Sequence, residues 1–310
     1  MKDEKILVTG ANSTIGEALA RSLCGDNEVW GLARFGDPDK RKALEDAGIR
    51  THSMDLGSGD FTGLPDNFTR VLHLAYFRGP RPEDIPEAMR VNVEGTGLLF
   101  GHCRKAKSIL YMSSHVIYNF YEDPWHKARE DEPFGGAPPS FSATATISKV
   151  SGEGVSRYCA RQFNVPVVIA RLNSPYGNAS GCLPTGNMDA VVAGGDVYAR
   201  WDPEPYSPIH LDDMCDQVEA MLDAASVSAN IVNWCGDEPV TVQHWTRLAG
   251  ELAGREPSII VREAPGSKRG SVADSTKRRS ITGPCKVDFD DAFRRIFAER
   301  HGSAGKAGDA

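Results

Sequence analysis

The segment from Thr9 to Gly16, which reads TGANSTIG, constrains the fold more than any other part of the chain. It follows the apolar run KILV and precedes EALARSLC, whose apolar residues have helical spacing. A strand, a tight turn and a helix in this order bring backbone N–H groups and the positive end of a helix dipole to one point. We therefore predict that a pyrophosphate binds at this turn.

Three positions of the turn have distinct steric roles. Glycine is needed at Gly10 for the tight turn and at Gly16 for close packing of the helix on the strand. The middle position holds Ser13, whose small side chain leaves room for a phosphate and can hydrogen bond to it. The alternative interpretation is a glycine-containing turn that binds no ligand.

Short apolar strands and helical segments alternate along the first half of the chain. Beyond the turn they cover residues 27–34, 39–48, 49–56, 69–76, 108–114, 148–163 and 165–173. Such alternation predicts an α/β fold with a doubly wound parallel sheet, which we expect to be complete by about Ser174.

The second half of the chain has a different composition. Gly, Pro and aromatic residues predominate from Pro175 to about Pro208, which indicates loops of a smaller lobe. Helical spacing returns over 212–225 and 242–254. We predict a nucleotide-binding domain over 1–174, a substrate lobe over 175–300 with some chain returning to the first domain, and a flexible tail over 301–310.

Composition excludes several classes of function. A net charge of −7 and a pI near 5.7 give no basic surface for nucleic acid, so a small-molecule partner is expected. No apolar run is long enough to span a membrane, and MKDEKILVTG contains no signal segment. Seven cysteines without a Cys-x-x-Cys pair predict reduced thiols, a cytoplasmic location and no metal site.

The end of the strand over 27–34 bears on the choice of cofactor. Dinucleotide enzymes that use NAD usually carry an acidic residue there for the adenosine ribose. This strand ends in GLAR without a carboxylate, and Arg34 can pair with a 2′-phosphate. NADP(H) is therefore favoured and NAD(H) is the alternative, while a solvated Arg34 without a ligand would leave the choice open.

Further motifs follow in register along almost the whole chain. They are MDL with Asp55, HLAY, VNVEGT with Asn92, SSHVIY, SKVSGE, RLNSPYG, PIHLDDM and DSTKRRSITGPCKVDFDDAFRR. Together with TGANSTIG they resemble the extended short-chain dehydrogenase/reductase family, also called the NAD-dependent epimerase/dehydratase family. The resemblance implies an enzyme with a Rossmann fold and a nicotinamide cofactor, and homodimers through a pair of long helices are common in that family.

The resemblance places the cofactor contacts on the turn, on Arg34 and on the motifs. The implied residues are Gly10, Asn12, Ser13, Thr14, Ile15, Gly16, Asp55, Leu56, Leu74, Ala75, Tyr76, Asn92, Lys149, Leu172 and Ser174.

The catalytic residues implied by the resemblance are incomplete in this chain. Ser114 would hydrogen bond the reacting oxygen, and Lys149 would hold the nicotinamide ribose. The family's proton donor is a tyrosine four residues before the lysine, and Ala145 occupies that position. Without an ionisable group, Ala145 cannot exchange a proton with the substrate.

Three interpretations of this gap stay open. In the first, redox chemistry persists with a relocated donor, for which Tyr76, Tyr118 and His115 are the nearest candidates. In the second, a lyase, isomerase or dehydratase uses a tightly held nicotinamide or an acidic group of its substrate. In the third, the protein binds NADP(H) as a regulator without turnover. A packing role is favoured for Tyr118 and His115, whereas Tyr76 follows a strand end that should face the cofactor and is equally suited to either role.

The substrate half departs from the nucleotide-sugar enzymes of the family. These usually keep an Asn in the RPxNVYG segment and an Arg before IHVDD, where this chain has Ser174 and Tyr206. Its aromatic residues instead suit an apolar or aromatic ligand, unless they form the core of the lobe. The predicted substrate contacts are Ser114, His115, Asn173, Met188, Trp201 and Tyr206, and further aromatic candidates are Phe77, Trp125 and Tyr198. We predict an NAD(P)(H)-dependent oxidoreductase that acts on a hydroxyl or carbonyl of a small non-nucleotide substrate.

Overall fold

The computed structural model describes residues 1–136, 142–263 and 267–302. They divide into two compact units. Unit 1 comprises residues 1–118, 133–172 and 215–232, and unit 2 comprises residues 119–132, 173–214 and 233–310. The chain thus crosses between the units several times, and one crossing, after Leu172, lies beside the predicted boundary at Ser174.

A seven-stranded sheet forms the centre of unit 1, in the order β12-β7-β5-β4-β1-β2-β3. The strands are β1 (Lys5–Thr9), β2 (Glu28–Ala33), β3 (Arg50–Ser53), β4 (Arg70–His73), β5 (Ser108–Ser114), β7 (Val167–Leu172) and β12 (Asn230–Trp234). The first six pair in parallel, which confirms the predicted doubly wound sheet of the Rossmann type. The expectation that the sheet is complete by Ser174 is wrong, because β12 joins it beyond β7 after a further helix.

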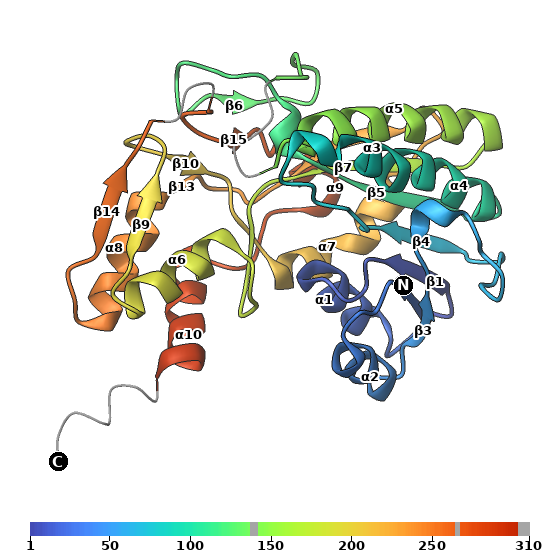
Figure 1. The fold of residues 1–310 in the computed structure, drawn as a ribbon, viewed down its shortest axis with the longest axis horizontal. Helices are drawn as coiled ribbons and strands as arrows, with labels where there is room; N and C mark the ends of the chain where they lie inside the picture. Colours follow the sequence, from blue (N-terminus) through green and yellow to red (C-terminus); the bar gives the residue numbers. More distant parts are fainter. Residues whose placement is uncertain (137–141, 264–266, 303–310) are drawn as a thin grey trace. The chain divides into compact units, whose positions relative to one another are not determined.

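Helices cover both faces of this sheet. Figure 1 shows α3 (Ile85–Met89), α4 (Gly95–His102) and α5 (Ala145–Phe163) on one face, and α1 (Thr14–Leu23), α2 (Pro38–Asp46) and α7 (Leu211–Asp223) on the other. On the face that carries α4 and α5, a core of mainly aliphatic and aromatic side chains fills the space between the sheet and these two helices. Since α5 begins at Ala145, it includes the position of the missing tyrosine.

The strand order sets where a ligand can bind. From β1 the chain continues outward through β2 and β3, and it then returns to place β4 on the other side of β1. The helices that follow β1 and β4 therefore lie on opposite faces, which opens a crevice at the carboxyl ends of these two strands.

Among its described residues, unit 2 contains three longer helices, one short helix and short strand pairs. The longer helices are α6 (Leu183–Val192), α8 (Val242–Ala253) and α10 (Phe289–His301), and the longest pair is β9 (Asp196–Ala199) with β14 (Ser258–Val261). Smaller elements are β6 (Lys127–Ala128) with β15 (Val272–Ala273), β8 (Pro175–Tyr176) with β11 (Ile209–His210), β10 (Pro205–Tyr206) with β13 (Val240–Thr241), and α9 (Thr276–Thr282). Figure 1 shows α8 beside β9 and β14.

Unit 2 departs from the sequence expectations at two places. The region from Pro175 to Pro208 was expected to be loops, but it contains the helix α6. The second residue of α6 is a proline, which the first turn of a helix tolerates. Met188 and Val191, three residues apart, lie on its buried face. Of the expected tail over 301–310, His301 still belongs to α10, and residues 303–310 lie outside the described residues.

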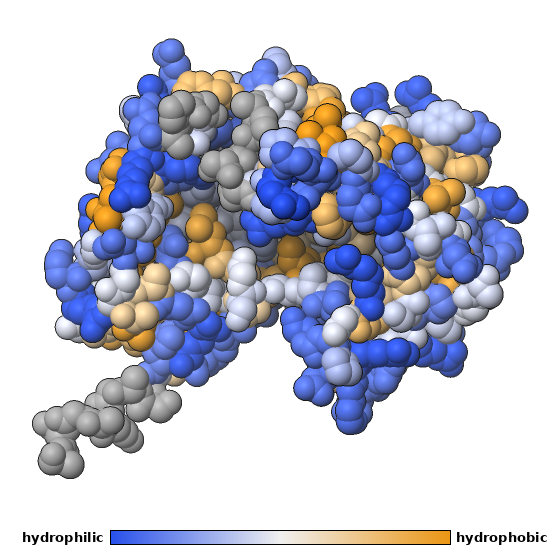
Figure 2. Space-filling view, viewed as in Figure 1, coloured by the Kyte–Doolittle hydropathy of each residue, from blue (hydrophilic) through white to orange (hydrophobic). Residues whose placement is uncertain are grey.

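The surface is mainly hydrophilic on the face that Figure 2 shows. Figure 2 shows hydrophilic residues over most of the visible face and hydrophobic residues in small separate patches. Among the described residues, no helix is both long and apolar enough to cross a membrane.

Candidate active site

A cavity of about 490 Å³ opens in unit 1 at the carboxyl ends of β1, β2 and β4. Its volume lies within the usual range of small-molecule sites. The predicted cofactor residues that line it are Gly10, Asn12, Ser13, Thr14, Ile15, Arg34, Asp55, Leu56, Leu74, Ala75 and Tyr76. Phe77 also lines it, whereas Gly16, Asn92, Lys149, Leu172 and Ser174 do not. The crevice expected from the strand order is thus also where most of the sequence-predicted residues meet.

The turn between β1 and α1 is built by two close approaches. Gly10 has a φ of +70°, and a Cβ there would lie 3.0 Å from the Ala75 backbone. A Cβ on Gly16 would lie only 2.2 Å from the Gly10 carbonyl oxygen. Ser13 caps α1, because its Oγ accepts a hydrogen bond of 3.1 Å from the Gly16 amide. Its hydroxyl proton can therefore still be donated to a phosphate.

Arg34 lies at the rim of the cavity, directly after β2. Its guanidinium is exposed and forms no ion pair or hydrogen bond with the described residues. Asp55 has a different environment, since its carboxylate accepts from the Gly57 amide at 3.1 Å and from Arg90 at 2.6 Å. Burial raises the pKa of Asp55, but the Arg90 and Gly57 hydrogen bonds outweigh it and leave the pKa below its ordinary value.

A buried chain of hydrogen bonds holds the end of β4 against β1. Thr9 Oγ1 accepts from the amides of Leu74 at 3.1 Å and Ala75 at 3.0 Å, so its own proton goes to His73 Nδ1 at 2.8 Å. The other ring nitrogen, Nε2, then donates to Thr96 Oγ1 at 2.8 Å. Burial, with a smaller contribution from the charge of Lys149, lowers the pKa of His73 to about 3. His73 is therefore a neutral structural residue that fixes the floor of the cavity.

Asn92 positions the loop that follows β4. Its Oδ1 accepts from the Phe77 amide at 2.7 Å, and its Nδ2 donates to the Phe77 carbonyl at 2.9 Å. Asn92 is 3% exposed, and it lies in a π-helical turn over Arg90–Glu94. Its amide thus bonds within the protein and supports the loop that lines the cavity, and a direct cofactor contact at Asn92 stays a prediction.

Lys149 extends from α5 toward β5. Its Nζ donates to the Met112 carbonyl at 2.7 Å and lies 4.3 Å from the centroid of the Tyr76 ring. The side chain is nearly enclosed, and burial lowers its pKa to about 7 although Glu153 acts in the opposite direction. Lys149 does not line the cavity itself, but it lies against the ring of Tyr76, which does.

Ser114 ends β5, two residues after the carbonyl that Lys149 binds. Its Oγ accepts from the Val116 amide at 3.2 Å, which leaves its proton available for a substrate oxygen. Leu172 is its partner in the register of β7, so both lie at the same edge of the sheet. Ala145 is 6% exposed, and its methyl group offers no proton.

A buried ionic network lies beneath Ser114 and was not predicted from the sequence. Arg171 donates to both carboxylate oxygens of Glu153, at 3.0 and 2.9 Å, and Ser113 donates to Glu153 at 2.6 Å. Burial lowers the pKa of Arg171, but Glu153 reverses this and raises it. A sequence signal existed, because Glu153 follows Lys149 by four residues and so shares its helix face.

Tyr118 and His115 belong to the core beside this network. The Tyr118 side chain is fully buried, and its hydroxyl accepts from Arg171 at 2.9 Å. The His115 ring is 4% exposed, and its centroid lies 4.8 Å from that of Tyr118. Their surroundings favour the packing role over proton transfer for Tyr118 and over substrate contact for His115.

The predicted substrate residues of unit 2 are mostly packing residues. Met188 is fully buried in the hydrophobic core of that unit, which favours the alternative interpretation of a packing residue. Tyr206 is 9% exposed, and its hydroxyl bonds to Glu204 at 2.8 Å and to Arg200. Of the residues proposed as an aromatic site, Met188 and Tyr206 thus form lobe core, as the alternative interpretation predicted.

The other candidates in unit 2 are held by neighbours or exposed. The guanidinium of Arg269 lies 4.1 Å from the centroid of the half-buried Trp201. Asn173 donates through Nδ2 to the Ser271 carbonyl at 2.7 Å. Ser174 has a buried Oγ without a hydrogen-bond partner among the described residues. Two remaining aromatic side chains are exposed, namely Trp125 and Tyr198.

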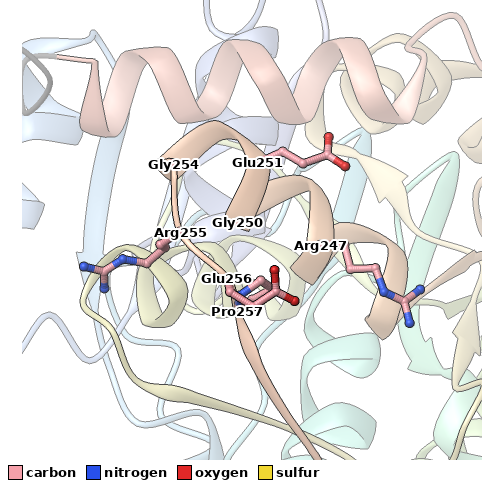
Figure 3. Close-up of a pocket in the computed structure, with 7 residues that line it drawn as sticks. All are labelled: Arg247, Gly250, Glu251, Gly254, Arg255, Glu256 and Pro257. Atoms are coloured by element: carbon pink, nitrogen blue, oxygen red, sulfur yellow. The ribbon is translucent and has the colours of Figure 1, made fainter.

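A second hollow, of about 370 Å³, lies at the carboxyl end of α8 in unit 2. Figure 3 shows that Arg247 and Arg255 point away from each other, so no group of side chains converges on a ligand. Arg255 instead donates to the carbonyls of Val191 and Val192 at 3.3 Å. Over the described ranges, no three His, Cys, Asp or Glu side chains are grouped to hold a metal ion. The cavity of unit 1 is therefore the better candidate.

Comparison with known proteins identifies the family. Residues 6–235 match the NAD dependent epimerase/dehydratase family. The chain belongs to this family. The match confirms the predicted family, an enzyme on a Rossmann fold, and a nicotinamide cofactor as the class of ligand. No curated protein matches the chain significantly.

Solved structures of 4-epimerases share the fold of this family member. UDP-glucuronic acid 4-epimerase from Bacillus cereus, in complex with UDP-glucuronic acid and NAD, is 20% identical with a TM-score of 0.81, over 96% of this chain and 99% of that one. UDP-N-acetylglucosamine 4-epimerase from Methanobrevibacter ruminantium is 18% identical with a TM-score of 0.81, over 97% and 100%. UDP-glucose 4-epimerase from Thermus thermophilus, in complex with NAD, is 20% identical with a TM-score of 0.75, over 93% and 96%. At these identities the likeness shows the fold alone.

Proposed function

We propose that the protein is an NADP(H)-dependent oxidoreductase that transfers a hydride to or from a hydroxyl-bearing carbon of a small substrate. The observation that carries this proposal is the cavity of unit 1, which has a phosphate-binding turn and the exposed guanidinium of Arg34 on its wall. A dinucleotide with a 2′-phosphate needs these two sites for anions in one cavity.

The preference for NADP(H) rests on charge. The strand β2 ends in Leu32 and Ala33, so no carboxylate there can bind the ribose hydroxyls or repel a phosphate. Arg34 follows directly and can form charge-assisted hydrogen bonds with a 2′-phosphate. NAD(H) is the alternative, since the structures of the Bacillus cereus and Thermus thermophilus enzymes are complexes with NAD.

The chain's own residues would bind and orient the reactants. A bound nicotinamide nucleotide supplies or accepts the hydride. Ser114 donates a hydrogen bond to the reacting oxygen, since its Oγ proton is not used by its capping contact with Val116. Lys149, whose Nζ donates to the Met112 carbonyl near the same end of the sheet, would hold the nicotinamide ribose.

A nucleotide-sugar epimerase is the second candidate, and the names of the structural neighbours favour it. Two positions argue for a substrate without a nucleotide. Ser174 and Tyr206 replace the Asn and the Arg that the family's nucleotide-sugar enzymes usually carry there. Tyr206 is held by Glu204 and Arg200 in the lobe core. The preference for an aromatic substrate loses support for the same reason, so we keep only the hydroxyl or carbonyl group as the defining feature.

Titration calorimetry with NADP⁺, NADPH, NAD⁺ and NADH tests the cofactor proposal. Arg34→Ala should weaken both NADP(H) forms by about 10-fold to 100-fold, the equivalent of one charge-assisted contact, and NAD(H) by less than about twofold. Arg50→Ala is the matched control, because Arg50 is exposed on the adjacent strand β3 and pairs with Glu28 outside the cavity. Equal losses for both cofactors in Arg34→Ala would contradict the assignment of the 2′-phosphate.

Product analysis separates the two candidate reactions. The protein is incubated with a panel of alcohols and carbonyl compounds, and separately with UDP-glucose and UDP-glucuronic acid. Net change in the absorbance of reduced nicotinamide with the panel supports the oxidoreductase. Interconversion of sugar epimers without net cofactor change supports the epimerase instead.

Two further predictions concern the whole protein. We propose a cytoplasmic location, which suits seven cysteines that are all free thiols. A homodimer stays a prediction from the family resemblance, and light scattering on the purified protein measures it directly.

A further inference from the structure

Tyr76 has an unusual combination of properties for a residue in a cofactor cavity. It lines the cavity of unit 1, yet its hydroxyl is buried without a hydrogen-bond partner among the described residues. The Lys149 ammonium lies 4.3 Å from the centroid of its ring. A buried phenol that lacks a partner is unfavourable unless a ligand completes its hydrogen bonding.

The backbone on both sides of Tyr76 is fixed by buried side chains. Thr9 binds the amides of Leu74 and Ala75 at 3.1 and 3.0 Å. Asn92 binds both the amide and the carbonyl of Phe77, at 2.7 and 2.9 Å. Tyr76 therefore stands between two anchored neighbours, which is the support that a catalytic side chain needs to keep its position.

The other positions that could supply a tyrosine hydroxyl are less suitable as proton donors. The hydroxyl of Tyr118 is bound by Arg171 in the core. Tyr111 is 3% exposed, and burial raises its pKa far above the ordinary value. Ala145, at the position of the family's tyrosine, has no proton to give. Of these residues, Tyr76 is the one that lines the cavity, through a side chain whose hydroxyl is itself buried.

We propose that Tyr76 is the proton donor and acceptor of the reaction, in place of the tyrosine missing at position 145, with Lys149 as its charge partner. This inference rests on the proposed function. In the direction of reduction, a reduced nicotinamide bound in the cavity would supply a hydride to the carbonyl carbon, while the O–H bond of Tyr76 breaks and its proton forms a new O–H bond on the substrate oxygen. The ammonium of Lys149 stabilises the phenolate, which regains a proton from solvent.

Nuclear magnetic resonance tests the placement of Tyr76 without any turnover. The protein is labelled with ¹³C at the Cζ atom of its eight tyrosines, and Tyr76→Phe assigns the signal by its loss. We expect saturation with NADP⁺ to shift the Tyr76 signal, and Lys149→Met to shift it without nucleotide. The signal of Tyr158, which is 64% exposed on α5, serves as the control and should not move. A Tyr76 signal that does not respond to bound NADP⁺ would overturn the proposal.

Kinetics test the chemical role with the best alcohol or carbonyl substrate of the panel. Tyr76→Phe should lower kcat by about 10²-fold to 10⁴-fold, the usual loss for a positioned acid or base, and leave KM within about threefold. Its calorimetric affinity for NADP⁺ should stay close to that of the wild type, and Tyr158→Phe should retain full turnover. Full turnover of Tyr76→Phe with NADP⁺ bound refutes the role of Tyr76 and leaves the proposed function intact. Absence of nucleotide binding in the wild-type protein refutes both.

Discussion

Replacing Arg171 by methionine should destabilise unit 1 strongly, because it leaves a carboxylate buried without its partner. The side chains of Arg171 and Glu153 are 0% and 4% exposed, and Arg171 donates two hydrogen bonds to Glu153 and one to Tyr118. After the substitution, Ser113 is the one described residue of this network that still donates to the Glu153 carboxylate. Removing one partner of a buried ion pair costs about 3–5 kcal/mol, so Arg171→Met should lose about this much free energy of unfolding.

Urea denaturation followed by far-ultraviolet circular dichroism measures this loss. The double variant Arg171→Met with Glu153→Gln removes both charges, so it should be more stable than Arg171→Met alone by about 1 kcal/mol or more. Arg21→Met is the matched control, because Arg21 pairs with Glu17 one turn away on the exposed face of α1, and it should cost at most about 0.5 kcal/mol. The account of the network fails if Arg171→Met costs less than about 1 kcal/mol, or if the double variant is less stable than the single one.

Three further predictions concern the cavity and its floor. Burial lowers the pKa of Lys149 from 10.5 to about 7, so between these pH values the unfolded chain holds a proton that the folded chain has released. The free energy of unfolding of the wild type should therefore rise from pH 7 to 10.5. In urea titrations this rise should be smaller in Lys149→Met. Thr9→Val removes the acceptor of the Leu74 and Ala75 amides, so it should cost about 1–3 kcal/mol of unfolding free energy and weaken NADP⁺ binding in calorimetry. Gly16→Ala forces the turn apart, because its Cβ would meet the Gly10 carbonyl at 2.2 Å, and calorimetry should show NADP⁺ affinity lower by about tenfold or more. Unchanged affinity in Gly16→Ala, or an unaltered pH dependence in Lys149→Met, would count against the respective assignment.

The sequence predicted those parts of the fold that local patterns determine. The turn from Gly10 to Gly16 and the apolar strands were recognisable because chain reversal and burial act within a few residues. The seventh strand, β12, was missed because its place at the sheet edge depends on the long return of the chain through α7. The helix α6 was missed because its Gly and Pro residues resemble a loop, although Met188 and Val191 mark its buried face.

Side-chain roles were predictable where the backbone alone positions them and less so where tertiary contacts decide. Residues of the turn and Arg34 line the cavity because they follow strand ends. Asn92 was expected to touch the cofactor, but the loop after β4 folds back and uses its amide through Phe77. The position of Tyr76 against Lys149 depends on that same loop and on α5, so the sequence could favour Tyr76 over Tyr118 as a candidate without showing that its ring lies against Lys149.

A crystal structure of the protein with NADP⁺ tests the central claim most directly. The account predicts the pyrophosphate at the turn from Gly10 to Gly16, the 2′-phosphate within hydrogen-bond distance of Arg34, and the nicotinamide ribose on the side of Tyr76 and Lys149. A nucleotide bound elsewhere, or with its 2′-phosphate turned away from Arg34 into solvent, would contradict it.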